Sequence, residues 1–125
     1  AQLRTVSRSY LAEQKHNKIQ ERLKELLILE FGDDNVVLEE NHVDVKVIQP
    51  SYLGFYEVKS ASYASECIKQ ALGQVLLYVH DDDDKREKKI FVVGQFPANG
   101  QDQEYIDYVK SHLNIEFDYL NVDIE

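Results

Sequence analysis

Two carboxylates and a lysine lie on neighbouring stretches of the sequence that alternate between apolar and polar residues. Asp44 lies in the stretch 43–47, and Glu57 and Lys59 lie in the next such stretch. Because successive residues of a β-strand point to opposite faces, we expect Glu57 and Lys59 on the same face. If the two strands pair through the connection 49–54, Asp44 comes level with Glu57. The sequence therefore predicts two carboxylates and an ammonium group side by side.

This combination suits a metal ion and a phosphate. Two close carboxylates repel each other as bare anions and are stabilised by a hard cation such as Mg²⁺, which takes oxygen ligands and keeps several waters. Asp44 and Glu57 are the expected ligands, and Mn²⁺ is expected to substitute for Mg²⁺. Such an ion polarises a phosphate and lowers the pKa of a bound water. Lys59 could position the attacking water or neutralise the transition state.

The surrounding sequence predicts alternating helices and strands around this group. Residues from about Ser9 to Glu30 have helical apolar spacing, and Gly32 follows as a stop. We expect Asn41 and His42 to form a tight turn, and Pro50 and Gly54 to make the next connection irregular or bulged. The strands are predicted at 36–40, 42–49, 52–60, 89–94 and 115–119, and two further helices at 64–79 and 103–112. The apolar strand at 89–94 can add parallel to the sheet because a helix precedes it.

Polar residues also recur along one line of each of the first two helices. Glu13, either His16 or Asn17, and Gln20 share a face, which is either solvated or directed into the site. Gln70, Gln74 and Tyr78 recur at four-residue steps on the second helix. Gly73 in the same helix costs about 1 kcal/mol relative to alanine, which suggests that this helix lies close against the sheet. A polar line at such an interface would need partners.

Length and composition indicate one domain covering residues 1–125. The chain has 125 residues, of which 43% are hydrophobic, and is large enough for one core. It contains no apolar run of about 20 residues, so we expect no membrane partner. Cys67 is the only cysteine. With no signal-like start, these features predict a cytoplasmic protein, and the absence of an initiator methionine leaves open that the domain belongs to a longer one.

The charge excludes some function classes. A net charge of −9 argues against a free-standing binder with a broad basic surface. Residues 1–30 carry six Lys or Arg against four Glu, whereas residues 100–125 carry seven acids against one lysine, so a polyanion should approach from the N-terminal side. The segment 80–89 is expected to be a solvated charged loop. The sequence has no glycine-rich phosphate loop, Gly-x-Ser-x-Gly motif or paired-histidine helix.

The order helix, three strands, helix, strand, with Asp44 on the second strand and Glu57-Val58-Lys59 on the third, resembles the PD-(D/E)XK (restriction-endonuclease-like) nuclease superfamily. Gln74 and Tyr78 have the spacing of the QxxxY element in the branch typified by the RecB nuclease domain. The resemblance covers residues 13–94, although Val43 replaces the proline of the motif. It implies an α/β fold with a mixed sheet, in which an αβββαβ core is followed by a C-terminal αβ extension.

The resemblance also implies roles. Asp44, Glu57 and the backbone carbonyl of Val58 would be the metal ligands, and Gln74 and Tyr78 would orient Lys59 or contact the DNA backbone. Additional candidates for the site are Glu13, His16, Gln20, Glu39 and Gln70. The implied function is metal-dependent hydrolysis of DNA in restriction, antiviral defence or repair, with DNA capture shared with a second domain, a second subunit or a second copy of the chain.

Two alternatives remain open from the residues alone. The first is a catalytically inactive nuclease-like module that binds nucleic acid or a protein partner. The second is a purely structural domain in which Asp44, Glu57 and Lys59 form a buried ion-pair network.

Overall fold

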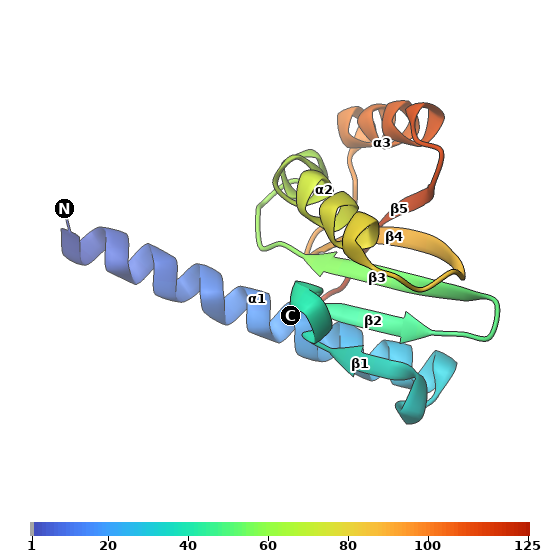
Figure 1. Cartoon of the computed structure of the whole chain (residues 1–125). Coiled ribbons are helices and arrows are strands. Elements are labelled where there is room, and N and C mark those ends of the chain that lie inside the picture. The colour runs from blue at the N-terminus through green and yellow to red at the C-terminus, as the bar shows by residue number, and fades with distance from the viewer. Residues whose placement is uncertain (1) are drawn as a thin grey trace.

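The computed structural model describes the main chain of residues 2–125 and the side chains from Arg8 onward. It is an α/β fold with one five-stranded mixed sheet and helices on both faces (Figure 1), which confirms the predicted class. The helices are α1 (Gln2–Phe31), α2 (Ala64–Asp81) and α3 (Gly100–His112). The strands are β1 (Val36–Leu38), β2 (Val45–Ile48), β3 (Tyr52–Val58), β4 (Glu87–Gly94) and β5 (Glu116–Asn121).

The strands lie in the order β1-β2-β3-β4-β5. The first three are antiparallel neighbours, whereas β4 and β5 run parallel to β3. Parallel neighbours need a crossover, which α2 provides between β3 and β4 and α3 provides between β4 and β5. The predicted parallel addition of β4 is therefore confirmed. Val45 pairs with Tyr56, so Asp44, one residue before β2, comes level with Glu57 as predicted.

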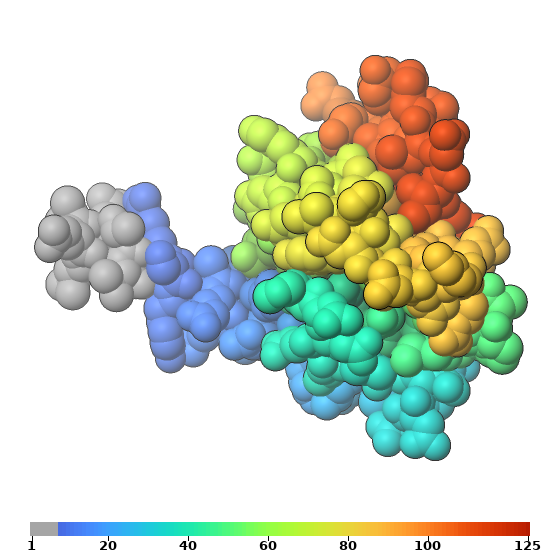
Figure 2. All heavy atoms as spheres, in the orientation of Figure 1, coloured from blue at the N-terminus to red at the C-terminus, as the bar shows by residue number. Residues whose placement is uncertain are grey.

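Each face of the sheet has its own apolar core, which explains why β3 and residues 90–94 of β4 are almost continuously apolar. The face covered by α2 and α3 buries residues including Leu53, Phe55, Ile68, Val75, Ile90, Val92 and Phe117. The opposite face packs on α1 and buries Ile19, Leu23, Leu27, Val45, Val47, Tyr56, Val58, Val93 and Val122. The first half of α1 continues beyond this contact and projects away from the sheet (Figures 1 and 2).

The chain between β1 and β2 differs from the predicted tight turn. A short 3₁₀ helix spans Glu40–His42, and Glu39, Asn41 and His42 have φ angles of 54°, 52° and 72°. Asn and His enter the left-handed region more often than most residues, which fits a turn at Asn41 and His42, but Glu39 has no such preference and the turn extends beyond the prediction. As a result β1 ends at Leu38 and β2 begins only at Val45, and Asp44 lies just before its strand rather than within it.

Helix α2 packs on the sheet as predicted and part of the connection 50–54 is irregular, but neither glycine has the role predicted for it. Gly54 lies inside β3 opposite Val47, and the irregular connection is confined to residues 49–51. Gly73 is exposed, and a Cβ atom added there would meet nothing within 4 Å, so it does not bring α2 close to the sheet. The contact with the sheet is made instead by Ala64, Ile68, Ala71 and Val75.

The segment 80–89 is only partly solvated, which corrects the predicted open loop. Asp82 is nearly buried and binds Lys46, while the guanidinium of Arg86 donates to the carbonyl of Gln49. Helix α3 begins three residues earlier than predicted because Asn99 and Asp102 form a capping box at its start. Among the described residues, no helix combines the length and the apolar character needed to cross a membrane.

Candidate functional site

Asp44 is held between two elements. Its Oδ2 accepts a hydrogen bond from the backbone N–H of Val58 on β3 at 2.8 Å and lies 3.2 Å from Nε2 of His16 on α1. The bond to Val58 fixes the carboxylate beside the end of β3, and the bond to His16 fixes α1 against the same point. The sheet and the first helix therefore share this carboxylate.

Glu57 lies next to Asp44 in a nearly dry position. Glu57 is 5% exposed, and its Oε1 has no hydrogen-bond partner among the described residues. Burial, and secondly the charge of Asp44, raise the pKa of Glu57 to about 7. The other oxygen, Oε2, lies 3.9 Å from Nζ of Lys59. The structure therefore brings Asp44, Glu57 and Lys59 together, with one buried carboxylate that titrates near neutral pH.

The carbonyl of Val58 faces the same region. The N–H of Lys59 donates to the carbonyl of Val93 on β4 at 2.9 Å. Because main-chain groups alternate in direction along a strand, the N–H and carbonyl of Val58 face the other way, towards β2. The N–H of Val58 indeed binds Asp44. An oxygen of the backbone is thus available on the side of the carboxylate pair.

His16 and Tyr78 complete the polar surroundings from the two helices. The hydrogen bond to Asp44 outweighs burial and raises the pKa of His16 above its usual 6.5. Burial, and then the charges of Glu57 and Asp44, raise the pKa of Tyr78 on α2, which places its phenol within electrostatic range of both carboxylates. The Tyr78 ring also lies 6.1 Å from that of His42, measured between centroids.

The remaining predicted residues divide into two groups. Gln20 is buried on α1 and donates to Oε1 of Glu39 at 3.4 Å, while its own Oε1 is unpaired among the described residues. His16 and Gln20 therefore face inward, whereas Glu13 is exposed. Gln70 and Gln74 are also exposed, and the partner of Lys59 is Glu57 rather than Gln74.

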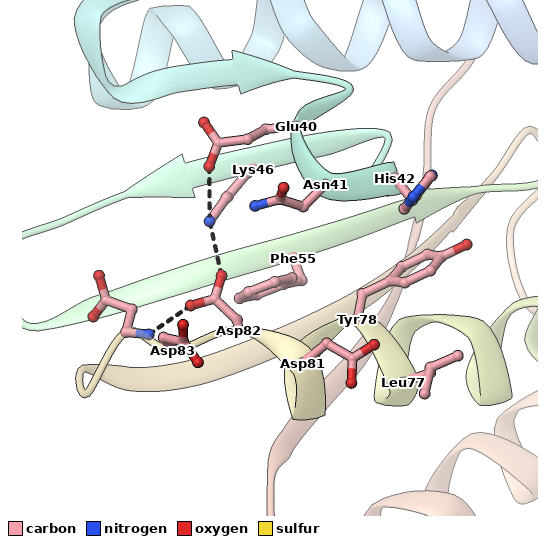
Figure 3. Close-up of a pocket in the computed structure, with 11 residues that line it drawn as sticks. Glu40, Asn41, His42, Lys46, Phe55, Leu77, Tyr78, Asp81, Asp82 and Asp83 are labelled. Carbon is pink, nitrogen blue, oxygen red and sulfur yellow. Dashed lines mark hydrogen bonds and ion pairs between the residues drawn. The ribbon is translucent and has the colours of Figure 1, made fainter.

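Lys46 was missed by the sequence reasoning. Its side chain is 7% exposed and binds Glu40 at 3.1 Å and Asp82 at 2.9 Å, with the ammonium 5.3 Å from the centroid of Phe55. Figure 3 shows these contacts within a cavity of ≈ 790 Å³ that is also lined by Tyr78. Two features of the sequence could have indicated this buried ion pair. They are a lysine between two valines on a predicted strand and a run of aspartates elsewhere in the chain. The contacts tie β2 to the loop after α2.

Asp44 opens into a different hollow from Lys46. A groove of ≈ 560 Å³ is lined by Glu39, Asn41, His42 and Asp44. Asn41 and His42 line the larger cavity as well, so the turn between β1 and β2 separates the two spaces. The larger cavity is dominated by the aspartate run, whereas the smaller groove gives access to Asp44.

The donor set at the carboxylate pair fits a hard divalent cation. Within the described residues, no group of three or more His, Cys, Asp or Glu side chains could hold a metal ion. Mg²⁺ commonly uses one or two carboxylates and keeps several waters, so it does not need such a group. The unpaired Oε1 of Glu57 and its raised pKa indicate a carboxylate that a cation would stabilise.

Comparisons of the chain with protein-family models, curated proteins and solved structures gave no match.

Proposed function

We propose that the chain is a metal-dependent nuclease that hydrolyses DNA phosphodiester bonds, of the restriction-endonuclease-like kind that its order of elements resembles. The observation that carries the proposal is the buried Glu57, whose pKa is raised to about 7 beside Asp44, with Lys59 next to it. A buried carboxylate whose pKa is strongly shifted beside another charge is typical of functional sites. Restriction, antiviral defence and repair are the settings in which such an activity would be used.

Each group has a definite task in this proposal. Asp44, Glu57 and the Val58 carbonyl would hold Mg²⁺ or Mn²⁺, which, when bound, lowers the pKa of a water and polarises the phosphate. The ammonium of Lys59 would donate to a phosphate oxygen and stabilise its developing charge. His16 keeps Asp44 oriented through their 3.2 Å contact, and the phenol of Tyr78 can donate to the DNA backbone at the edge of the site.

The overall reaction is hydrolysis. The attacking water loses a proton, its oxygen bonds to phosphorus, one P–O ester bond breaks, and the leaving oxygen gains a proton. At neutral pH Glu57 is present in both protonation states, and only the ionised form can serve as a ligand. We therefore expect activity to rise with pH as Glu57 ionises.

Plasmid cleavage tests this proposal. Supercoiled plasmid is incubated with the protein and Mg²⁺ or Mn²⁺, with and without a chelator, and nicked and linear products are measured. We expect metal-dependent cutting that falls by at least about 100-fold in Glu57→Gln and in Lys59→Met, since each removes a group acting on the transition state.

A matched control lies on α2. Glu66 and Lys69 form an exposed pair, also 3.9 Å apart, so Glu66→Gln and Lys69→Met remove the same charges outside the site and should leave cutting unchanged. Circular dichroism verifies folding of all four variants. Cutting that survives in both Glu57→Gln and Lys59→Met would overturn the assignment.

A catalytically inactive module that binds nucleic acid or a protein partner is the second candidate. It is favoured by one observation, namely that Oδ2 of Asp44 already has Val58 and His16 as partners. A carboxylate engaged in this way can serve as a structural link. Calorimetric titration with Mg²⁺ separates the two, because the inactive module should show no binding that depends on Asp44 and Glu57.

A further inference from the structure

Helix α1 is longer than its contact with the sheet requires. Its buried residues are Ile19, Gln20, Leu23 and Leu27, all in the second half. The first half projects from the molecule beyond the end of β3 that carries Glu57 and precedes Lys59 (Figure 1). Among the described side chains of this half, His16 is the first that is partly buried, and residues 8–15 are all exposed. This half of the helix therefore contributes little to the core.

Positive charges follow one side of this helix. Arg8, Lys15, Lys18 and Arg22 are separated by seven, three and four residues. At 100° per residue these positions fall within an arc of about 80°, and at 1.5 Å per residue they span about 21 Å. All four are exposed. We call these four residues the basic stripe. In the sequence, Arg4 continues the same spacing.

The basic stripe stands out against an acidic molecule. Residues 1–20 carry four Lys or Arg and one Glu, so they have a net charge of +3 while the rest of the chain carries −12. The one acid, Glu13, lies about 140° or more around the helix from Arg8, Lys15 and Lys18. Arg22 is 3.8 Å from Glu25, and Lys18 and Arg22 line a shallow hollow together with Asp123 and Glu125. Arg8 and Lys15 have no ion pair among the described residues. The outer part of the stripe thus keeps its charge uncompensated.

We infer that the basic stripe binds the phosphate backbone of a DNA duplex and leads it to the carboxylate pair. Affinity for DNA comes largely from Lys and Arg at phosphates, and cations aligned along a helix are a typical footprint of such binding. The same helix places His16 at Asp44, so DNA lying along the stripe reaches the end of the molecule that holds the site. The inference rests on the proposed function for what happens to the DNA.

The stripe favours a duplex over a single strand. Proteins that bind single strands combine cations with aromatic side chains on which bases stack. Tyr10, an exposed aromatic residue of this half, lies about 140° around the helix from Lys15, about 120° from Arg22 and about 80° from Lys18. The stripe itself contains no aromatic residue. Contact with a continuous phosphate backbone is what such a row of charges provides.

Fluorescence anisotropy with a labelled 20-bp duplex tests this inference on the full chain, with chelator present so that no cutting occurs. The double variant Arg8→Gln/Lys15→Gln is compared with Lys85→Gln/Lys110→Gln. The control pair also removes two charges but lies on the loop before β4 and on α3. Size-exclusion chromatography of each variant shows whether the association state has changed.

We expect the stripe variant to bind the duplex at least about tenfold more weakly near 0.1 M salt. The slope of log K against log salt should also become shallower by about two, because each lost phosphate contact removes about 0.9 from the slope. The control pair should stay within about twofold of wild type. Equal losses in both pairs, or a stripe variant that binds normally or only changes its association state, would overturn the inference.

The outcomes separate this inference from the proposed function. Loss of binding in the stripe variant together with cutting that survives in Glu57→Gln would leave the stripe in place and reject the catalytic site. Cutting that depends on Glu57, with normal binding by the stripe variant, would support the catalytic site and reject the stripe. A wild-type protein that does not bind the duplex at all would reject the stripe directly.

Discussion

Glu57 is the residue on which the candidate site depends. A glutamate that is 5% exposed, with one oxygen unpaired among the described residues, is costly to keep charged. The nearby ammonium of Lys59 and the imidazole of His16 lower its pKa, but burial and the charge of Asp44 outweigh them. The buried charge of Glu57 therefore contributes little to the stability of the metal-free fold at neutral pH. A cation between the two carboxylates would reduce the cost of burying that charge.

The raised pKa of Glu57 predicts how stability changes with pH. The usual pKa of 4.5 applies to the unfolded chain and about 7 to the folded one, so the folded state binds more protons between these values. The contribution of Glu57 to the free energy of unfolding is fully present below about pH 4.5 and is lost as pH rises to about 7. The total loss is up to about 3 kcal/mol. Glu57→Gln should remove this loss, as measured by urea unfolding of the metal-free protein at pH 5 and pH 8.

His16 adds a loss of the same sign, because its pKa is raised and its pair with Asp44 weakens as pH rises through that pKa. The pH dependence that remains in Glu57→Gln should therefore disappear in the double variant with His16→Asn. Glu66→Gln is the exposed control and should follow wild type. If Glu57→Gln is less stable than wild type at pH 8, Glu57 belongs to a structural ion-pair network.

At the scale of elements, the sequence predicted the part of the fold that periodicity controls. Alternation identified β2 and β3, and the apolar run before Gly94 identified a parallel strand. Since a two-residue period fixes which side chains share a face, Asp44 and Glu57 could be placed level before the structure was known. From the sequence, the line of His16 and Gln20 could be solvated or directed into the site, because helical spacing alone does not show what lies opposite a face.

What the sequence could not predict depends on contacts between distant segments. The 3₁₀ turn before Asp44 has positive φ at three residues that are not glycine, which local propensity disfavours. The buried pair of Lys46 and Asp82 joins residues 36 positions apart. The resemblance implies that Gln74 lies near Lys59, yet the face of α2 that packs on the sheet is apolar and Gln74 is exposed.

Two glycines in neighbouring elements should respond in opposite ways to alanine. In Gly73→Ala the new methyl group on α2 meets open space, so the higher helix propensity should raise the free energy of unfolding by about 0.5–1 kcal/mol. In Gly94→Ala the methyl group on β4 would clash with the Tyr119 hydroxyl, which is held by its 2.6 Å bond to the Phe96 carbonyl, and with Sγ of Cys67. That crowding should cost about 1–3 kcal/mol.

Urea unfolding of the two variants at one pH measures both effects. A loss of stability in Gly73→Ala would mean that α2 packs differently along its outer face. A neutral Gly94→Ala would mean that β4 and β5 can separate to admit the methyl group, which would also loosen the parallel half of the sheet.

The distribution of charge over the molecule bears on how a protein with a net negative charge could bind DNA. A protein with a net charge of −9 is a poor general binder of DNA, and about half of its acids line the larger cavity or lie in the C-terminal segment 100–125. The outer part of α1, with Arg8 and Lys15, lies away from these acids, whereas Lys18 and Arg22 share a hollow with Asp123 and Glu125. In the proposal, polyanion contacts would therefore be confined to the outer end of α1, beyond the end of β3 that carries Glu57. The acidic remainder would disfavour other DNA orientations.

The central claim is that Asp44 and Glu57 together hold a divalent cation, and anomalous scattering from crystals grown with Mn²⁺ tests it most directly. The claim predicts a peak within coordination distance of both carboxylates and the Val58 carbonyl at pH 8, and its loss in Glu57→Gln crystals. The run of acids at 81–84 serves as a control in the same crystal for adventitious binding. A peak at that run with none between Asp44 and Glu57 would contradict the claim.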